Sequence, residues 1–291
     1  MSQKILITGA FGQLGYSVSN LLKKKYDLIL TDIDGVDSSD NLIYLDIVDE
    51  NQINEVISKT YPDVIINLAS YTDVDACELN PQRSALLNKE SIKLLLKYFD
   101  GKFIQISTDY VFDGTNGPYS EDDLTNPINS YGRTKLEAEK ILTEKSRDWC
   151  ILRTNVLFDY YNNTKASFIK WVIDSLKSNS TIRVVNDQWN NPTWTENLAE
   201  VIELVIKKNV NGLYHYGGAD YLNRYNFAIM IADIFDLDKS LIMPISTAEL
   251  KQPAKRPIKG GLRTNKIEHA LNIKSNKLVD CLMQIKSRIL E

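Results

Sequence analysis

The chain has 291 residues, 43% of them hydrophobic and 25% charged, a composition typical of a globular protein with one large or two modest domains. Its formal net charge of −4 offers no basic field to a nucleic-acid backbone, so nucleic acid is not an expected partner. No run of residues approaches the ~20 apolar side chains that cross a bilayer, and no membrane partner is expected.

The cysteines and histidines give no sign of a crosslinked or metal-stabilised fold. Cys77, Cys150 and Cys281 are far apart and lack CxxC spacing, so we expect reduced thiols in a cytoplasmic protein. His215 and His269 stand in unrelated contexts, and no metal site is expected.

The N-terminal residues predict a turn that holds a dinucleotide. Residues 4–8 form an apolar run that predicts a buried strand, and residues 9–15 supply a glycine-rich turn before a helix ending near Lys25. Glycines let the backbone approach a pyrophosphate, whose charge suits the helix N-terminus. A second apolar run, residues 27–31, ends at Asp32, where an acid can bind an adenosine ribose and repel a 2′-phosphate.

Strand and helix patterns continue to alternate up to residue 153. Strands are expected at 42–45, 64–69, 103–108 and 149–153, and helices at 50–59, at 83–99 and from Tyr131 onward. Repeated units of this kind predict an α/β fold with a doubly wound parallel sheet of the Rossmann type. Ligands bind such sheets at the carboxyl ends of the strands, where each motif of this chain falls.

The chain after residue 156 follows the alternation less regularly. Helices are expected at 166–177, 196–207, 224–235 and after 277, and strands at 182–185 and 212–216, the last returning to the sheet. We therefore expect a dinucleotide-binding domain of residues 1–155, joined by 180–218, and a smaller, discontinuous substrate domain within residues 156–291. The polar stretch 114–129 predicts a long loop that acts as a flap over the site.

Tyr131 and Lys135 are spaced to share one helix face. A phenol normally titrates near pH ~10, and a neighbouring ammonium lowers that pKa by stabilising the phenolate. Thr108 and Asp109 follow directly on a predicted strand, which brings a hydroxyl and an acid to the same edge of the sheet. Together these residues predict a proton-transfer site beside the dinucleotide turn.

The combination of motifs resembles the extended short-chain dehydrogenase/reductases over nearly the whole chain, and within them most resembles the dTDP-4-dehydrorhamnose reductase family. The matching segments are Thr8 to Gly15, Ala69 to Asp75, Ser107 to Phe112, Tyr131 to Lys135, and Asn186 to Gln188. The resemblance implies hydride transfer from NADH or NADPH to the 4-keto carbon of a nucleotide-linked 6-deoxyhexose. Tyr131 would protonate the new alkoxide.

The resemblance also assigns roles to individual residues. Lys135 would depress the pKa of Tyr131 and bind the nicotinamide ribose, while Thr108 would hydrogen-bond the carbonyl oxygen. The implied cofactor-binding residues are Gly9, Phe11, Gly12, Gln13, Leu14, Asp32, Asp46, Ile47, Ala69, Ser70, Tyr71, Tyr131 and Lys135. The implied substrate-binding residues are Val74, Asp75, Thr108, Asp109, Val156 and Arg256, with Arg256 placed to bind phosphate.

Three positions depart from related enzymes in an informative way. Tyr110 stands where sugar-nucleotide dehydratases carry a second acid, which favours simple reduction. Val156 replaces a tryptophan that stacks near the sugar, which predicts a differently shaped sugar pocket. Ser17 replaces a glutamate used for a metal at a dimer interface, so a magnesium site is not carried over. Asp32 favours NADH, although this branch often accepts both cofactors.

Two other readings stay open at the level of sequence. The regulatory β subunit of methionine adenosyltransferase is similar to this family, and that reading predicts cofactor binding without turnover. An epimerase or dehydratase of the same fold would recycle tightly held NAD+ instead of consuming a reduced cofactor. The sequence leaves the particular nucleotide sugar, the product stereochemistry and a homodimeric assembly open.

Overall fold

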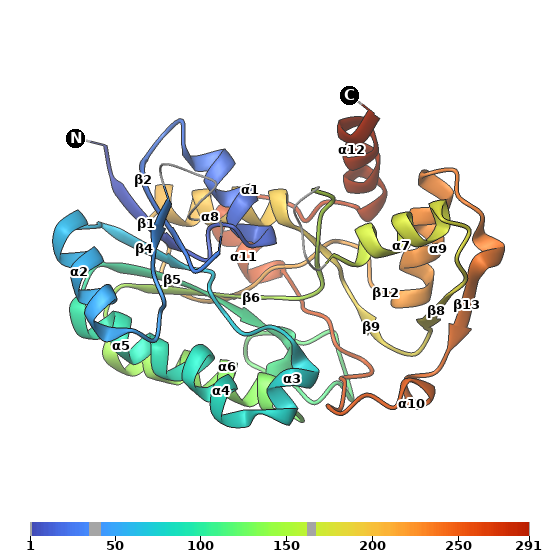
Figure 1. The fold of residues 1–291 in the computed structure, drawn as a ribbon, viewed down its shortest axis with the longest axis horizontal. Helices are drawn as coiled ribbons and strands as arrows, with labels where there is room; N and C mark the ends of the chain where they lie inside the picture. Colours follow the sequence, from blue (N-terminus) through green and yellow to red (C-terminus); the bar gives the residue numbers. More distant parts are fainter. Residues whose placement is uncertain (1, 35–41, 162–166, 291) are drawn as a thin grey trace.

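The computed structural model describes residues 2–34, 42–161 and 167–290, which form two lobes (Figure 1). The first lobe contains a seven-stranded sheet in the order β11-β6-β5-β4-β1-β2-β3, in which every pair is parallel. Its strands are β1 (Lys4–Thr8), β2 (Asp27–Asp32), β3 (Leu42–Tyr44), β4 (Val64–Asn67), β5 (Lys102–Thr108), β6 (Trp149–Thr154) and β11 (Gly212–His215). The predicted doubly wound α/β fold is confirmed, including the return of the chain to the sheet at β11.

Helices cover both faces of this sheet, because successive side chains of a strand point to opposite sides. Ile5 and Ile7 pack with α1 (Gln13–Leu22), α8 (Thr195–Lys207) and α11 (Asn265–Leu271). Leu6 packs on the other face with α2 (Glu50–Thr60), α5 (Ser91–Tyr98) and α6 (Ser130–Lys145). The sheet is therefore buried on both sides, which explains its near-continuous apolar strands.

The region between β4 and β5 differs from the single helix expected at 83–99. It contains α3 (Val74–Leu79), which was not expected, then α4 (Pro81–Ala85), a π-helical turn η2 (Leu86–Glu90) and α5. Asp73 caps α3 by accepting a hydrogen bond from the Ala76 amide at 2.9 Å. The π-helical turn adds a residue to the helix and places Asn88 toward the sheet edge, a type of distortion frequent at functional sites.

The second lobe packs around Phe158 and Phe227, both fully buried. Its helices are α7 (Phe168–Lys177), α9 (Arg224–Ile234), α10 (Thr247–Leu250) and α12 (Leu278–Leu290), with a 3-10 turn η4 (Lys239–Leu241). Short strand pairs join β8 (Ile182–Val185) to β13 (Ile242–Ile245), β9 (Trp189–Asn190) to β12 (Leu222–Asn223), and β7 (Leu157–Phe158) to β10 (Thr193–Trp194).

The two lobes share the stretch 180–218, which was expected to belong wholly to the first. Strand β8 pairs with β13 of the second lobe, whereas β11 belongs to the large sheet and α8 packs against it. The division into two domains at residue 156 stays a prediction. Among the helices that the structure describes, none is long and apolar enough to cross a membrane.

Residues 252–263, here called the strap, connect the two lobes near the carboxyl edge of the sheet. The Gly117 amide donates to the Lys259 carbonyl at 2.9 Å, and the Tyr119 amide donates to the Gly261 carbonyl at 3.0 Å. Tyr119 is buried and stacks on Phe112 with ring centroids 4.3 Å apart. The loop 114–129 is thus hydrogen-bonded to the strap at several points, and its role as a flap over the site stays a prediction.

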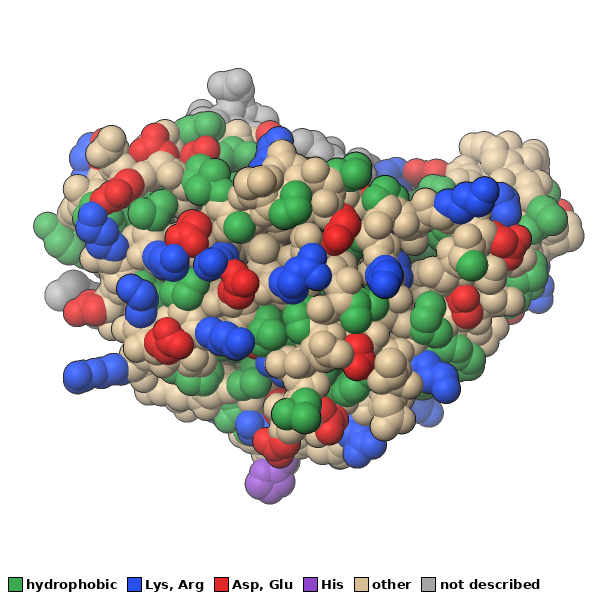
Figure 2. Space-filling model, turned by 90° about the horizontal axis from the view of Figure 1, so that it is seen from below, with side chains coloured by type: hydrophobic (Ala, Val, Ile, Leu, Met, Phe, Trp, Pro, Cys, Tyr) green, Lys and Arg blue, Asp and Glu red, His purple; other side chains and the backbone are tan. Residues whose placement is uncertain are grey.

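The helical face over α4, α5 and α6 carries mixed charges. Figure 2, seen from below, shows acidic and basic side chains interspersed on this face. Lys89 lies 3.0 Å from Glu137, and Lys93 lies 2.7 Å from Glu90. The face of the molecule that this view shows therefore carries no patch of predominantly one charge.

Candidate active site

The site lies at the carboxyl edge of the large sheet, where three central strands end in a chain of polar side chains. Thr8 donates to Asn67 Oδ1 at 2.6 Å, and Asn67 Nδ2 donates to Gln105 Oε1 at 2.9 Å. These three residues come from β1, β4 and β5 and are buried, so their hydrogen bonds fix the relative heights of the strand ends.

The turn after β1 requires its glycines. Gly9 has a φ of +69°, and a Cβ there would lie 2.8 Å from the Ala69 amide nitrogen. A Cβ on Gly15 would lie 2.2 Å from the Gly9 carbonyl oxygen. The Gly12 amide donates to the same carbonyl at 3.1 Å, which closes the turn. The turn therefore packs backbone against backbone and leaves the close approach that a pyrophosphate needs.

Asp32 anchors this turn to the end of β2. Its Oδ2 accepts a hydrogen bond from the Phe11 amide at 2.9 Å, and its Oδ1 accepts one from the Ile33 amide at 2.8 Å. Phe11 is 43% exposed, whereas Leu14 is buried under the turn. Helix α1 begins at Gln13 with no side chain of the described residues capping its N-terminus, the arrangement in which helix amides bind phosphate.

The other residues expected around the cofactor line the neighbouring strand ends. Asp46 accepts a hydrogen bond from the Val48 amide at 3.1 Å, and Ile47 is buried beside it. The Ala69 amide donates to the Thr8 hydroxyl at 3.3 Å. These residues therefore sit beyond β3 and β4, on the same edge as the glycine turn.

Asn88 holds the remaining cofactor-side segment and was not expected from the sequence. Its Oδ1 accepts hydrogen bonds from the Ser70 hydroxyl at 2.8 Å and from the Tyr71 amide at 2.7 Å, while its Nδ2 donates to the Tyr71 carbonyl at 3.0 Å. An asparagine inside a predicted helix gives no sequence signal. The π-helical turn that aims it inward cannot be read from a regular helical period.

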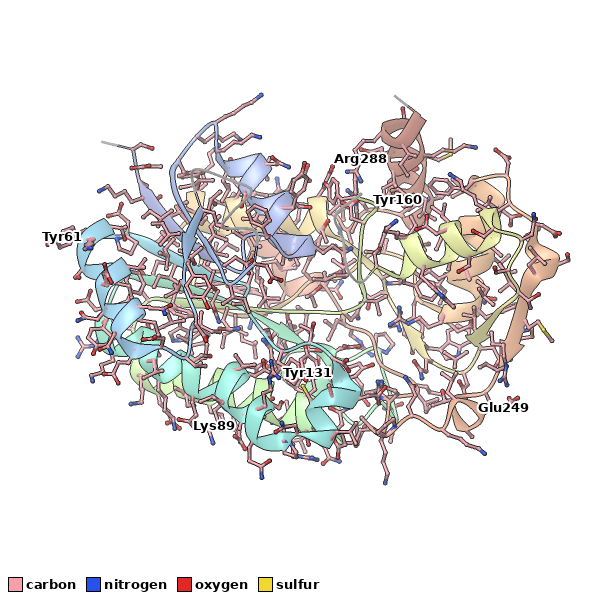
Figure 3. The ribbon with its side chains drawn as sticks, viewed as in Figure 1. Tyr61, Lys89, Tyr131, Tyr160, Glu249 and Arg288 are labelled. Atoms are coloured by element: carbon pink, nitrogen blue, oxygen red, sulfur yellow. The ribbon has the colours of Figure 1, made fainter. Side chains whose placement is uncertain are left out.

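Tyr131 is placed by the start of α6. Asn129 caps the helix by accepting a hydrogen bond from the Gly132 amide at 2.8 Å, and a Cβ on Gly132 would lie 2.1 Å from the Tyr110 carbonyl oxygen. Tyr131 is half-buried in the interior between α6 and the sheet (Figure 3). Burial raises its pKa above the ordinary value, although Thr108 lowers it in part.

Lys135 lies on the same face of α6 but differs from expectation in what it contacts. Its Nζ donates to the Ile106 carbonyl at 2.7 Å. Burial lowers the pKa of Lys135 to about 8, and the pKa of Tyr131 is raised, not depressed as expected. The physical reason is that the ammonium is turned to a backbone carbonyl of β5, while the phenol is desolvated.

Asp109 is buried directly after Thr108, in the 3-10 turn η3 (Asp109–Val111). Its Oδ2 accepts a hydrogen bond from the Gly261 amide at 3.3 Å, and its Oδ1 accepts one from Thr108 at 3.4 Å. Burial raises its pKa to about 6, because these two long hydrogen bonds and the charge of Arg224 compensate the desolvation only in part. Arg224 belongs to the second lobe and was not expected at the site.

Asp75 and Arg256, both expected to contact substrate, contact each other. Arg256 Nη1 lies 2.9 Å from Asp75 Oδ1, and Nη2 lies 2.9 Å from Oδ2, a forked ion pair. The Ala254 amide adds a 3.0 Å hydrogen bond to the same carboxylate. Burial alone would raise the pKa of Asp75, but these partners lower it on balance. The pair ties α3 to the strap.

The three remaining positions lie at the borders of the site. Val74 is the half-buried first residue of α3. Val156 has a φ of +42°, which is rare for a β-branched residue, and it packs against the apolar core of the second lobe. Ser17 is buried under α8, with its hydroxyl 2.7 Å from that of Thr195. The described residues contain no group of three or more ligands suited to a metal ion.

The parallel sheet, the glycine turn and the set of Thr108, Tyr131 and Lys135 define an extended short-chain dehydrogenase/reductase. Residues 3–288 match the family described as the RmlD substrate binding domain. The chain belongs to this family.

Individual relatives agree over nearly the full length. The dTDP-4-dehydrorhamnose reductase of Aggregatibacter actinomycetemcomitans is 32% identical, covering 98% of each chain. The solved dTDP-4-dehydrorhamnose reductase of Bacillus anthracis in complex with NADP has a TM-score of 0.90 and 28% identity, covering 99% of this chain and 100% of that one. The methionine adenosyltransferase 2 subunit beta of Bos taurus is 30% identical, covering 92% of this chain and 82% of that protein.

Proposed function

We propose that the chain is a nicotinamide-dependent reductase of the 4-keto group of a nucleotide-linked 6-deoxyhexose, either dTDP-4-dehydrorhamnose or a close relative. The observation that carries this proposal is that Tyr131 and Lys135 of α6 meet the end of β5, which bears Thr108, at the sheet edge that also bears the glycine turn. A relative 32% identical over 98% of the chain is named dTDP-4-dehydrorhamnose reductase, which supports the same substrate class.

The residues present fit a nicotinamide dinucleotide. Gly9 and Gly15 keep the turn free of side-chain atoms that would collide with the backbone, and the first turn of α1 offers amides to a pyrophosphate. Asp32 lies where the adenosine ribose is expected, a position that favours NADH. The NADP complex of the Bacillus anthracis relative shows that a member of the family binds the phosphorylated form, so we propose NADH or NADPH.

The bound nicotinamide would supply a hydride to the carbonyl carbon of the sugar. Tyr131 is protonated at neutral pH, as an ordinary phenol is, and burial raises its pKa further, so it can donate a proton to the oxygen that becomes negative. Thr108 ends β5 at the same sheet edge and offers a hydroxyl that can hydrogen-bond the same oxygen. We assign Lys135 to the nicotinamide ribose.

We further propose that the sugar lies between the two lobes, bordered by Val74, Asp75, Asp109, Val156 and Arg256. Tyr110 supports reduction over water elimination, because it stands where sugar-nucleotide dehydratases carry a second carboxylic acid. We place the reaction in the cytoplasm, where the three free, buried cysteines stay reduced. A homodimer is the assembly to test by light scattering.

A second candidate function follows from the relative named methionine adenosyltransferase 2 subunit beta, at 30% identity over 92% of the chain. In that case the chain would bind a nicotinamide cofactor and a partner protein without turnover. The two candidates differ in one measurable respect, because only the enzyme consumes NADH or NADPH stoichiometrically with a keto sugar. An epimerase or dehydratase would likewise show no net consumption.

The experiment is oxidation of NADH and NADPH by the purified protein with dTDP-4-dehydrorhamnose, with the product read by NMR. Turnover supports the proposal, and tight cofactor binding without turnover supports the regulatory function. Tyr131→Phe should lower kcat by about 10²–10⁴-fold while leaving cofactor affinity within a few-fold, because only the proton donor is lost. Tyr98→Phe removes a phenol on α5 that contacts Glu50, and this control should keep its activity.

A further inference from the structure

Arg224 enters the site from the second lobe. It is the first residue of α9, and its amide donates to the Gln188 carbonyl at 3.2 Å. Its guanidinium carbon lies 5.2 Å from the centroid of the Phe168 ring, so the flat group is held against an aromatic face. Arg224 is half-buried and is held by these two contacts.

Backbone hydrogen bonds place Arg224 near Asp109, because Gln188 is followed by Trp189, whose carbonyl accepts the Gly260 amide at 2.9 Å, and the next amide, of Gly261, donates to Asp109 at 3.3 Å. The charge of Arg224 acts on Asp109 and Tyr110. It forms no ion pair with a carboxylate of the described residues. Arg256 is a second cation whose charge acts on Arg224. Its guanidinium is already engaged in the forked ion pair with Asp75. Of these two arginines, Arg224 is the one whose guanidinium forms no ion pair with a carboxylate of the described residues.

The guanidinium of Arg224 is partly removed from water without a contacting carboxylate among the described residues, which is costly, and burial lowers the pKa of Arg224. The negative charge of Asp109 attracts the Arg224 guanidinium without forming an ion pair with it. Burial raises the pKa of Asp109 to about 6, so that charge is itself disfavoured. A phosphate group would relieve the cost, since its oxygens match the planar fork of arginine. The acidic chain needs such a local cation to hold a doubly charged substrate.

We propose that Arg224 binds the diphosphate of the nucleotide-linked sugar and so sets the requirement for a nucleoside diphosphate over a free sugar. This inference rests on the proposed function. It assigns Arg256 a different role, which is to hold the strap onto Asp75 of α3.

The test measures the affinity of thymidine diphosphate and of thymidine for the full chain by calorimetry. Arg224→Gln should weaken the binding of thymidine diphosphate about 10- to 100-fold, the loss expected for charge-assisted hydrogen bonds, and should change thymidine affinity less than two-fold. Arg224→Lys keeps the charge without the fork and should fall between. Arg183→Gln removes an exposed arginine of β8 and should bind like the wild type.

Unchanged thymidine diphosphate affinity in Arg224→Gln would overturn the inference. Arg224 would then serve to compensate the negative charge of Asp109. An equal loss for thymidine would also overturn it, because the defect would then lie in the nucleoside pocket or the fold. NADPH affinity and the circular dichroism of each variant check folding, and Arg224→Lys is the variant to compare if the glutamine form is unfolded. Arg224-dependent binding without reductase turnover would refute the proposed reaction alone.

Discussion

Replacing Asp109 by asparagine should stabilise the protein at neutral pH. The residue is 3% exposed, and its carboxylate accepts long hydrogen bonds from the Gly261 amide at 3.3 Å and from Thr108 at 3.4 Å. Burial therefore raises its pKa from 3.8 to about 6. Asparagine has nearly the same shape and keeps an oxygen for the Gly261 amide, but it carries no charge that must be desolvated.

The sign and size of the effect follow from the two pKa values. Below pH 3.8 the carboxyl is protonated in both the native and the unfolded chain, so burying it costs the native state no charge desolvation. As the pH rises from 3.8 to about 6, only the unfolded chain ionises freely, so the wild type loses stability. The difference of about 2 pKa units corresponds to about 3 kcal/mol, which Asp109→Asn should regain above pH 7.

The assay is urea denaturation of both proteins between pH 4 and pH 8. The advantage of the variant should be smallest at pH 4 and reach its plateau above pH 7. Asp113 is the comparison, because hydrogen bonds led by those of the Thr115 amide and hydroxyl lower its pKa to about 2. Asp113→Asn should therefore destabilise the protein at pH 8. A constant difference between Asp109→Asn and wild type across the pH range would refute the reasoning.

Two other variants test the charges around α6. Glu139→Ala should lower the free energy of unfolding by about 3–5 kcal/mol in urea titrations, because it leaves the buried Arg153 guanidinium without the carboxylate that lies 2.7 Å from Nη2. Lys135→Met should gain stability at pH 7, since burial lowers the pKa of Lys135 to about 8 and the native state must hold the charge below that pH. That gain should shrink toward pH 10, and its absence at pH 7 would argue against a desolvated ammonium.

The sheet could be predicted from the sequence because its strands are buried on both faces and read as continuous apolar runs. Residues 64–69 and 103–108 are examples, and the structure differs from these ranges by only one or two residues. The glycine turn was equally visible, since Gly9 and Gly15 have no alternative at the distances found. Features set by neighbouring residues, such as apolar strands and a glycine turn, are therefore the ones that a single sequence predicts best.

The strap and the second lobe's part of the site could not be predicted in this way. The Tyr119 amide and the Gly261 carbonyl are brought together from opposite halves of the chain by backbone hydrogen bonds that leave no side-chain pattern. Arg224 begins an ordinary apolar helix, and a sequence does not distinguish an arginine that faces a site from one that faces water. The fork between Asp75 and Arg256 likewise depends on a contact between distant segments.

The predicted activation of Tyr131 by Lys135 differed from the structure for a reason that extends to the whole site. Burial displaces the pKa values of Asp109, Tyr131 and Lys135 toward their neutral forms, so the folded protein holds each group where its charge is disfavoured. If these residues served stability alone, their replacement would be expected to destabilise the protein. An increase in stability in Asp109→Asn and Lys135→Met, together with a loss of turnover, would therefore mark these residues as retained for chemistry.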